Sequence, residues 1–147
     1  MDLMASLNIS VKQSEIRKLT REISRRSGAY EKAVTDEVHK AALNIESHAK
    51  QLAPVDDNLL RSNIQNETEP GKPSANVHNN VFYAAYVEFG TGRFAASYLA
   101  DKSADIKRYA MTFFKDGKGK SRTQPFLFPA MDAEGPKLIK RLRGLKL

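Results

Sequence analysis

The stretch YAAYVEFGTG, at residues 83–92, determines more of the fold than any other part of this chain. Aromatic and small residues lead into one carboxylate, Glu88, and then into a Gly-Thr-Gly segment. Glycine allows backbone conformations that a side chain forbids, so we expect a tight turn at Gly90 and Gly92. We expect Glu88 to be a partly buried acceptor for backbone N–H groups near that turn.

A second stretch of the same kind is QPFLFPA, at residues 124–130. Two prolines, Pro125 and Pro129, bracket an apolar wedge and stiffen the backbone on both sides of it. Such a segment specifies shape and contact rather than chemistry. We expect Phe126 and Phe128 to bring the chain back into the core.

The residues before these stretches predict one long helix. Apolar residues recur three or four positions apart from Tyr30 to Leu52, for about six turns, and form a single stripe. Pro54 ends this helix, because the residue before a proline is pushed out of the helical region.

Shorter elements are expected next. Asp56 can accept backbone N–H groups ahead of a helical turn at residues 59–61, and that turn leads into Ile64. Between residues 62 and 81, polar residues interleave with isolated apolar ones, and EPGKP at residues 69–73 makes a sharp break. This pattern predicts a β-hairpin.

Weaker patterns lie on either side. Alternation of apolar and polar residues at 7–11 predicts a short strand, and residues 14–28 predict a charged helix. Alternation at Tyr109, Met111 and Phe113 predicts another strand, followed by an exposed loop at residues 116–120.

The last part of the chain predicts a basic amphipathic helix. Leu138, Leu142 and Leu145 recur at helical spacing between lysines and arginines. Gly135-Pro136 either starts this helix, with proline in its first turn, or kinks a helix that begins at Pro129. With no internal repeat or linker, we expect residues 1–147 to form one domain.

Composition limits the class of protein. The chain has 147 residues, no cysteine and a formal net charge of +7. That length can bury a core without disulfides or metal, and the lack of cysteine fits a reducing compartment. No apolar run approaches the roughly 20 residues that span a bilayer, so we expect a soluble protein without membrane contact. The positive charge attracts anions, although charge runs are usually solvated surface.

The sequence contains no recognisable constellation for catalysis. None of the three histidines stands at the spacing of a zinc motif such as H-E-x-x-H. Gly-Lys-Ser at residues 119–121 resembles the end of a phosphate-binding loop, but Phe114 occupies the position of its first glycine. We therefore expect no catalytic residue, no cofactor and no metal, and a protein that is not an enzyme.

The order of these segments resembles a known family. A long helix ending in LAPVD at residues 52–56, then LRSNI at 60–64, the stretch at 83–92, the stretch at 124–130 and a final helix are similar to small tail components of tailed bacteriophages. These are tail-completion or head–tail joining proteins of long-tailed phages, and the resemblance covers about residues 13–143. The family usually has V-D-T-G after the long helix, whereas Asp57 and Asn58 stand in the last two places here. Asparagine tolerates a left-handed backbone, so the turn can be kept.

This resemblance implies an α+β fold, in which the long helix and the C-terminal helix pack on a small antiparallel sheet. It also implies a structural role in the virion neck, with assembly in the host cytoplasm. Copies would form a homo-oligomeric ring, commonly hexameric, between a connector or head-completion protein and a tail terminator or tail tube protein. A ring subunit needs a heterologous interface, in which one patch docks onto a different patch of its neighbour.

Two segments are candidates for the halves of that interface. They consist of Glu88, Phe89, Gly90, Thr91 and Gly92 on one side, and Pro125, Phe126, Leu127, Phe128 and Pro129 on the other. An equally supported alternative is that the phenylalanines seal the core of their own subunit. The turn after the long helix is assigned to Pro54, Asp56 and Asn58.

Basic residues near the C-terminus are candidates for contact with an acidic partner or with passing DNA. They are Lys118, Lys120, Arg122, Lys137, Lys140, Arg141 and Arg143. A second hypothesis is that the chain is a basic nucleic-acid-binding module. The charge supports it, and the lack of a recognised binding motif opposes it.

Overall fold

The computed structural model describes residues 7–10, 17–18, 21, 28–56, 58–111, 119 and 121–146. Its elements are β1 (Leu7–Ser10), α2 (Gly28–Leu52), α3 (Asn58–Ser62), β2 (Ile64–Thr68), β3 (Ala75–Asn79), α4 (Ala84–Phe89), α5 (Gly92–Leu99), α6 (Ala104–Met111) and α7 (Leu127–Arg143). The fold is α+β, as expected. Residues 17–18 and 21 are helical, and the rest of the helix expected at 14–28 lies outside the described residues.

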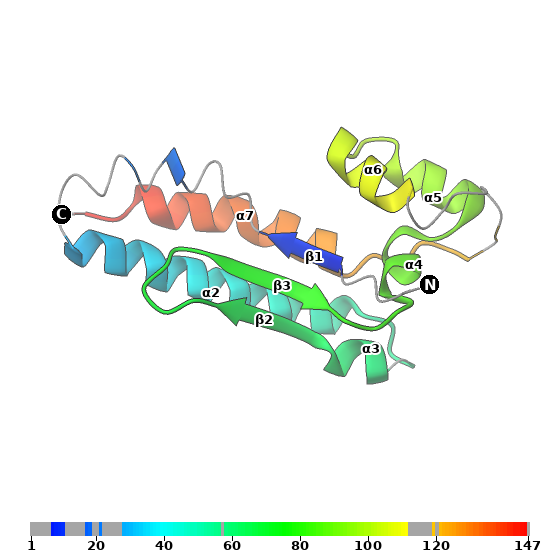
Figure 1. Ribbon diagram of the computed structural model, residues 1–147, viewed down its shortest axis with the longest axis horizontal. Helices are drawn as coiled ribbons and strands as arrows, with labels where there is room; N and C mark the ends of the chain where they lie inside the picture. The colour runs from blue at the N-terminus through cyan, green and yellow to red at the C-terminus, as the bar shows by residue number, and fades with distance from the viewer. Residues whose placement is uncertain are drawn as a thin grey trace.

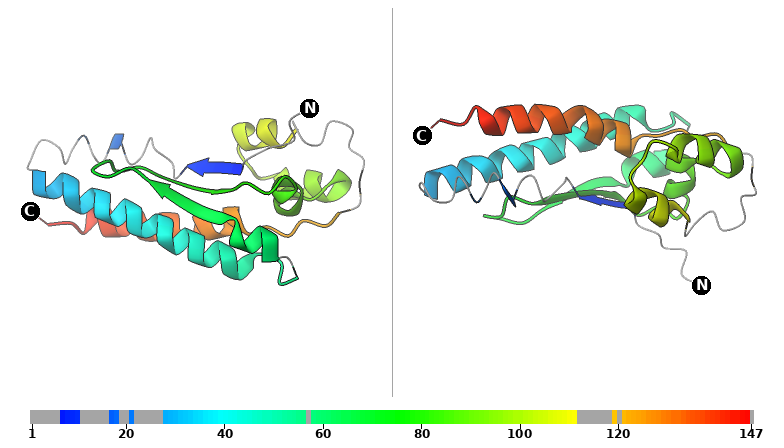
Figure 2. Two further views of the ribbon diagram at one scale, coloured as in Figure 1. Left: turned by 60° about the horizontal axis from the view of Figure 1, so that its bottom comes forward. Right: turned by 90° about the horizontal axis from the view of Figure 1, so that it is seen from above.

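Two long helices run along the molecule in opposite directions. Figures 1 and 2 show α2 and α7 side by side, with α7 returning toward the start of α2. The predicted apolar stripe of α2 is confirmed along most of its length, because Val34, Val38, Ile45 and Ala49 are all buried, whereas Leu52 at its end is 40% exposed. The helix ends before Pro54, as predicted. Tyr30 donates a hydrogen bond to the carbonyl of Leu145 at 2.6 Å and so ties the two helix ends together.

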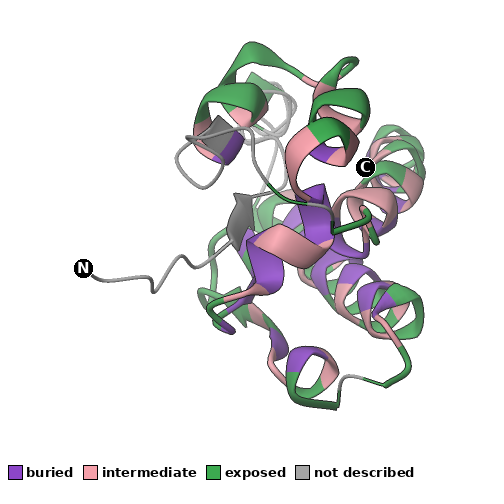
Figure 3. Cartoon of the chain, turned by 90° about the vertical axis from the view of Figure 1, so that its right-hand side faces the viewer, coloured by how far each residue is buried: buried purple, intermediate pink, exposed green. Residues whose placement is uncertain are grey.

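The sheet has three antiparallel strands in the order β1-β3-β2. The hairpin formed by β2 and β3 is the one predicted from residues 62–81, and α2 packs against both strands. The strand predicted at residues 7–11 is β1, which pairs with β3 from Leu7 to Ser10. On α2 the buried side chains form one face and the exposed ones lie on the opposite face, and β3 is buried at four of its five positions (Figure 3).

A buried amide connects the sheet to the helices at one end. Asn79, the last residue of β3, is fully buried. Its Nδ2 donates to the carbonyl of Leu60 in α3 at 2.7 Å, and its Oδ1 accepts the N–H of Val81 at 2.9 Å. A buried polar group is stable only when its hydrogen bonds are made, so these partners fix where α3 and α4 sit.

The strand predicted around residues 109–113 is wrong. Residues 104–111 form α6, and α5 precedes it, where no element was expected. Ile106, Tyr109 and Ala110 lie three and four positions apart, and all three pack into the core. That helical spacing decides the structure, while the alternation of Tyr109 and Met111 is coincidental. Phe113 lies outside the described residues.

Two predicted boundaries also change. The helix α7 begins at Leu127 and continues through Pro136, so a start at Gly135-Pro136 is wrong. Asn58 is the first residue of α3, and no described residue other than glycine has a positive φ, so the left-handed turn expected there is wrong. Asp56 is an exposed turn residue, and its role as a cap stays a prediction because Asp57, directly before α3, lies outside the described residues.

Candidate interaction surfaces

The carboxylate of Glu88, on α4, binds the beginning of α7. Its side chain is fully buried. Oε2 accepts the N–H groups of Phe126 and Leu127 at 2.8 and 2.9 Å, and Oε1 accepts the N–H of Phe128 at 3.0 Å. The first N–H groups of a helix have no acceptor within the helix and carry its positive dipole end. Glu88 therefore caps α7 from a different element.

The capping is reciprocal, because the segment before α7 satisfies the end of α4. Val87 accepts the N–H of Gln124 at 2.9 Å through its carbonyl, and Phe89 accepts the hydroxyl of Thr123 at 3.1 Å. Thr91 donates its N–H to the carbonyl of Ser121 at 3.0 Å. We call this contact the α4–α7 joint, formed by residues 87–91 and 121–128. It brings together the two stretches that the sequence marks out.

Glycine is required at one point of the α4–α7 joint. Gly90 has a φ of 72° and Gly92 a φ of 55°, which confirms the predicted turn. A Cβ placed on Gly90 would lie 2.6 Å from the hydroxyl oxygen of Thr123 and 2.9 Å from its backbone nitrogen. Both the conformation and the close backbone approach therefore exclude a larger residue.

Aromatic rings enclose the carboxylate. The ring of Phe89 lies 5.6 Å from that of Phe128 and 6.4 Å from that of Tyr98, centre to centre. The hydroxyl of Tyr98 donates to Oε1 of Glu88 at 3.3 Å.

The contacts of Glu88 define what this carboxylate can do. Burial raises its pKa, and the three backbone N–H groups and the Tyr98 hydroxyl act in the opposite direction. Burial beside the Glu88 carboxylate also raises the pKa of Tyr98. Each hydrogen bond that Glu88 makes with a described residue comes from a donor, so the carboxylate is held in place as an acceptor. This is a structural arrangement, not the setting of a general base, and the predicted N–H donors are those of α7 rather than those of the glycine turn.

This geometry corrects part of the predicted interface. Glu88, Phe89, Gly90, Phe126 and Leu127 are buried within their own chain, so in this conformation they do not present a docking surface. The alternative, that the phenylalanines seal the core of their own subunit, is confirmed for Phe89 and Phe126. The remaining candidates, Thr91, Gly92, Pro125, Phe128 and Pro129, are half-buried, and their contact with a neighbour stays a prediction.

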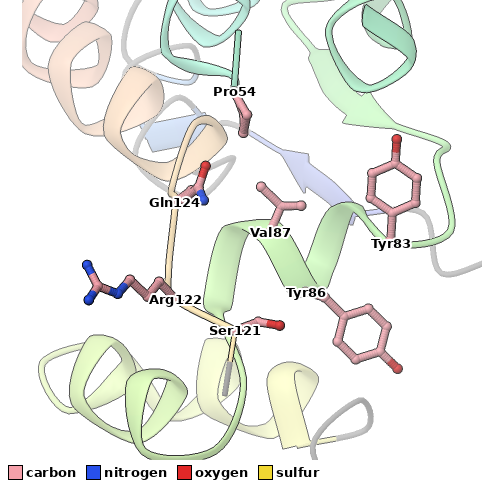
Figure 4. A pocket seen from close by; sticks show the side chains of 7 residues that line it. All are labelled: Pro54, Tyr83, Tyr86, Val87, Ser121, Arg122 and Gln124. Carbon is pink, nitrogen blue, oxygen red and sulfur yellow. The ribbon is translucent and has the colours of Figure 1, made fainter. Parts of the chain in front are cut away.

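A hollow of about 490 Å³ opens beside the α4–α7 joint. Pro54 lines it from the end of α2, Tyr83, Tyr86 and Val87 line it from the start and body of α4, and Arg122 lines it from the segment before α7 (Figure 4). Figure 4 shows the two tyrosine rings on one side of α4 and Arg122 on the other. Tyrosine and arginine are enriched where proteins bind one another tightly.

Large apolar side chains are exposed near this hollow. Leu52 is 40% exposed, Val55 80%, Leu59 57% and Phe82 60%. Leu52 ends α2, Val55 lies in the link to α3, Leu59 is in α3, and Phe82 lies two residues before α4. These parts of the chain lie at one end of the molecule (Figure 1). We call these four residues the apolar end. Sequence analysis missed it, although an apolar valine between Pro54 and Asp56 in a turn was a visible signal.

The predicted basic residues have different environments. Arg122, Lys137, Lys140 and Arg143 are exposed, and Lys118 and Lys120 lie outside the described residues. Arg141 is not free to face a partner, which corrects its prediction.

Arg141 is held by two carboxylates. Its Nε donates to Glu37 on α2 at 2.6 Å, and its Nη2 donates to Glu134 on α7 at 2.6 Å. Asn44 on α2 also donates to Glu134, at 3.1 Å. Since these contacts join α2 to α7, Arg141 stabilises the helix pair.

Comparison with known proteins identifies the family. Residues 17–90, half of the chain, match the family model described as "Bacteriophage HK97-gp10, putative tail-component". No curated protein and no solved structure matches the chain. No helix in the described part of the chain is long and apolar enough to cross a membrane. The matched residues hold the long helix, the hairpin and the Glu88 half of the α4–α7 joint, and the chain therefore belongs to this HK97-gp10-like tail-component family.

Proposed function

We propose that this protein is a structural subunit of the phage neck, where copies form a ring that joins or completes the tail at the head–tail interface. Its membership in a tail-component family supports a place in the tail. The observation that carries the finer proposal is the apolar end, which exposes large side chains beside a hollow lined by tyrosine and arginine.

The apolar end has the chemistry of a protein-binding surface. Burying a valine, leucine or phenylalanine side chain completely contributes about 1.5 to 3 kcal/mol relative to leaving it exposed. Clustered exposure of such residues marks an interaction site, whereas single exposed residues do not. Four of them around one end of the chain therefore favour a contact with another polypeptide.

The partner in this proposal is a second copy of the chain, in a heterologous contact. A ring closes only when two different patches meet. The half-buried candidates Thr91, Gly92, Pro125, Phe128 and Pro129 are the proposed receiving patch. Six copies per ring is the number that the family resemblance implies. A connector or head-completion protein would lie above the ring, and a tail terminator or tail tube protein below it.

The experiment compares two apolar surfaces of the same chain. The variant Val55→Asp with Leu59→Asp places charge in the apolar end, and Leu43→Asp places charge at an equally exposed leucine on the body of α2. Both keep the core intact, so both should melt within a few degrees of the wild type. The measurements are sedimentation velocity, negative-stain imaging and completion of tails in a reconstituted joining reaction.

We expect rings and completed tails from the wild type and from Leu43→Asp, and monomers without joining activity from the double variant. Rings formed equally well by the double variant would contradict the role of the apolar end. Full joining activity from protein that never forms a ring would contradict the proposed function itself.

A further inference from the structure

We propose that the outer face of α7 binds duplex DNA through its phosphate backbone. Lys137, Lys140 and Arg143 are exposed at three-residue spacing along the helix, and exposed Lys146 follows just beyond its end. We call these four residues the cationic stripe. The proposal belongs to the single chain and does not depend on the ring.

The cationic stripe differs from the positive charges of the molecule that are paired with carboxylates. Six other described cations are paired with carboxylates: Lys32 with Asp36, Lys50 with Glu46, Lys72 with Glu69, Lys102 with Asp101, Arg108 with Asp105, and Arg141 with Glu37 and Glu134. Arg61 and Lys107 donate to backbone carbonyls, and Arg93 lies over the ring of Phe94. No side chain of the cationic stripe makes an ion pair or hydrogen bond with another described residue. Its charge is therefore available to an external anion.

Nearby acids reduce this charge only in part. Glu37 and Glu134 are both bound to Arg141. Asp132 is an exposed carboxylate on α7, five residues before Lys137. Lys40, an exposed cation on α2, adds positive charge to the helix that lies beside α7. Positive charge therefore remains in excess along this surface.

The helix dipole does not account for the whole cationic stripe. Cations in the last turn of a helix are stabilising by about 0.3 to 1 kcal/mol, and the effect falls off beyond that turn. This explains Lys140 and Arg143, which lie in the last turn of α7. Lys137 precedes that turn and Lys146 follows the helix, so a separate reason is needed for them.

The chemistry of the stripe favours a duplex over other anions. Binding to single strands relies on aromatic side chains that stack on bases, and the four members of the stripe are all lysine or arginine. An acidic protein would be expected to need apolar anchors as well, and the large exposed apolar side chains of the described chain lie on α2, at the apolar end and before α4. The phosphate backbone of a duplex is negatively charged along its whole length, so a protein needs only cations to bind it.

The spacing of the stripe suits a duplex. Lys137 and Arg143 are separated by about 9 Å along the helix axis. A duplex carries one negative charge per roughly 1.7 Å of its axis with both strands counted, so the same length of duplex holds about five phosphates. Four phosphate contacts predict a slope of about −3.6 in the logarithm of affinity against the logarithm of salt concentration. Affinity should then fall about 150-fold between 50 and 200 mM salt.

The test measures fluorescence anisotropy of a labelled 20-base-pair duplex of arbitrary sequence with the purified full chain. The variant changes Lys137, Lys140, Arg143 and Lys146 to glutamine. A control with the same change in net charge replaces Lys72, between β2 and β3, Arg93 on α5, and Lys107 and Arg108 on α6, all of them exposed and none on α2 or α7. Thermal melting checks that both variants remain folded. If the quadruple variant does not fold, Lys137→Gln alone replaces it, and this single change should lower the magnitude of the salt slope by about 0.9.

We expect the quadruple stripe variant to lose at least about 100-fold in affinity at 50 mM salt and most of its salt slope, while the control keeps both. Equal losses in the two variants would overturn the proposal, because net charge alone would then explain binding. So would an absence of wild-type binding at 50 mM salt. Tighter binding to polyglutamate or to vesicles of anionic phospholipid than to the duplex, lost in the same variant, would assign the surface to a different partner.

Discussion

The α4–α7 joint and the apolar end are built from similar residues but have opposite exposures. Both hold aromatic, aliphatic, glycine and proline residues, yet Phe89 and Phe126 are fully buried while Val55 and Phe82 are largely exposed. At the joint, residues 121–128 of the same chain cover residues 87–91. No segment among the described residues covers the apolar end in this way. Residue composition therefore predicts that a surface will make contacts, but not whether the partner is the same polypeptide.

The largest effect should come from removing a fully buried ring of the joint. Phe126→Ala deletes a fully buried aromatic side chain, and such deletions lower the free energy of unfolding by about 3 to 5 kcal/mol. The matched control is Phe82→Ala at the apolar end, which should change it by less than about 0.5 kcal/mol. Urea denaturation of both variants measures the difference. Similar values for the two would remove the contrast between the regions.

The carboxylate of the joint should be the next most important group. Glu88→Gln keeps the side-chain shape but replaces a charged acceptor that serves three backbone N–H groups. Because such groups are costly to leave unsatisfied when buried, we expect a loss of about 2 to 3 kcal/mol in the free energy of unfolding. Glu31→Gln, on the exposed first turn of α2, is the control and should stay near the wild type. An unchanged stability of Glu88→Gln would mean that α7 does not need this cap.

Glycine substitutions separate the joint from the rest of α7. Gly90→Ala should cost about 2 kcal/mol or more, since it forces an alanine to a positive φ and against Thr123. Gly135→Ala, within α7 and with open space around its Cβ, should instead raise stability by up to about 1 kcal/mol. Opposite signs in thermal melting are expected. A stabilising effect at Gly90 would contradict the close approach described for the joint.

Neighbouring cations on α7 provide the smallest contrast in stability. Arg141→Gln leaves Asn44 as the remaining partner of the buried Glu134 among the described residues, and we expect a loss of about 1 to 2 kcal/mol. Lys140→Gln, one residue away and exposed, should change stability by less than about 0.5 kcal/mol. If both cost the same in urea denaturation, Arg141 is not the link between α2 and α7 that its hydrogen bonds indicate.

Local patterns predicted the parts of the fold that depend on local sequence. The stripe of α2, its end at Pro54 and the hairpin all follow from spacing and turn residues within short windows. The short helices α5 and α6 were missed because each presents only a few apolar residues, and alternation at 109–111 suggested a strand instead.

The candidate site was predicted only in outline. Glu88 was expected to accept backbone N–H groups, but its donors lie about forty residues further along the chain and no local pattern connects them. The same holds for Asn79, whose partner in α3 cannot be inferred from spacing, and for Arg141, whose carboxylates come from two helices. Such contacts depend on the tertiary arrangement.

The most direct test of the account asks whether the two halves of the α4–α7 joint meet within one copy. The chain has no cysteine, so Thr91→Cys with Ser121→Cys introduces a single reactive pair at positions joined by two hydrogen bonds. The protein is oxidised both as dilute monomer and after ring assembly, and is then run on a non-reducing gel. We predict an internally crosslinked monomer in both cases. Covalent dimers and higher multimers after assembly would contradict the account, because they would show that the two stretches join neighbouring copies.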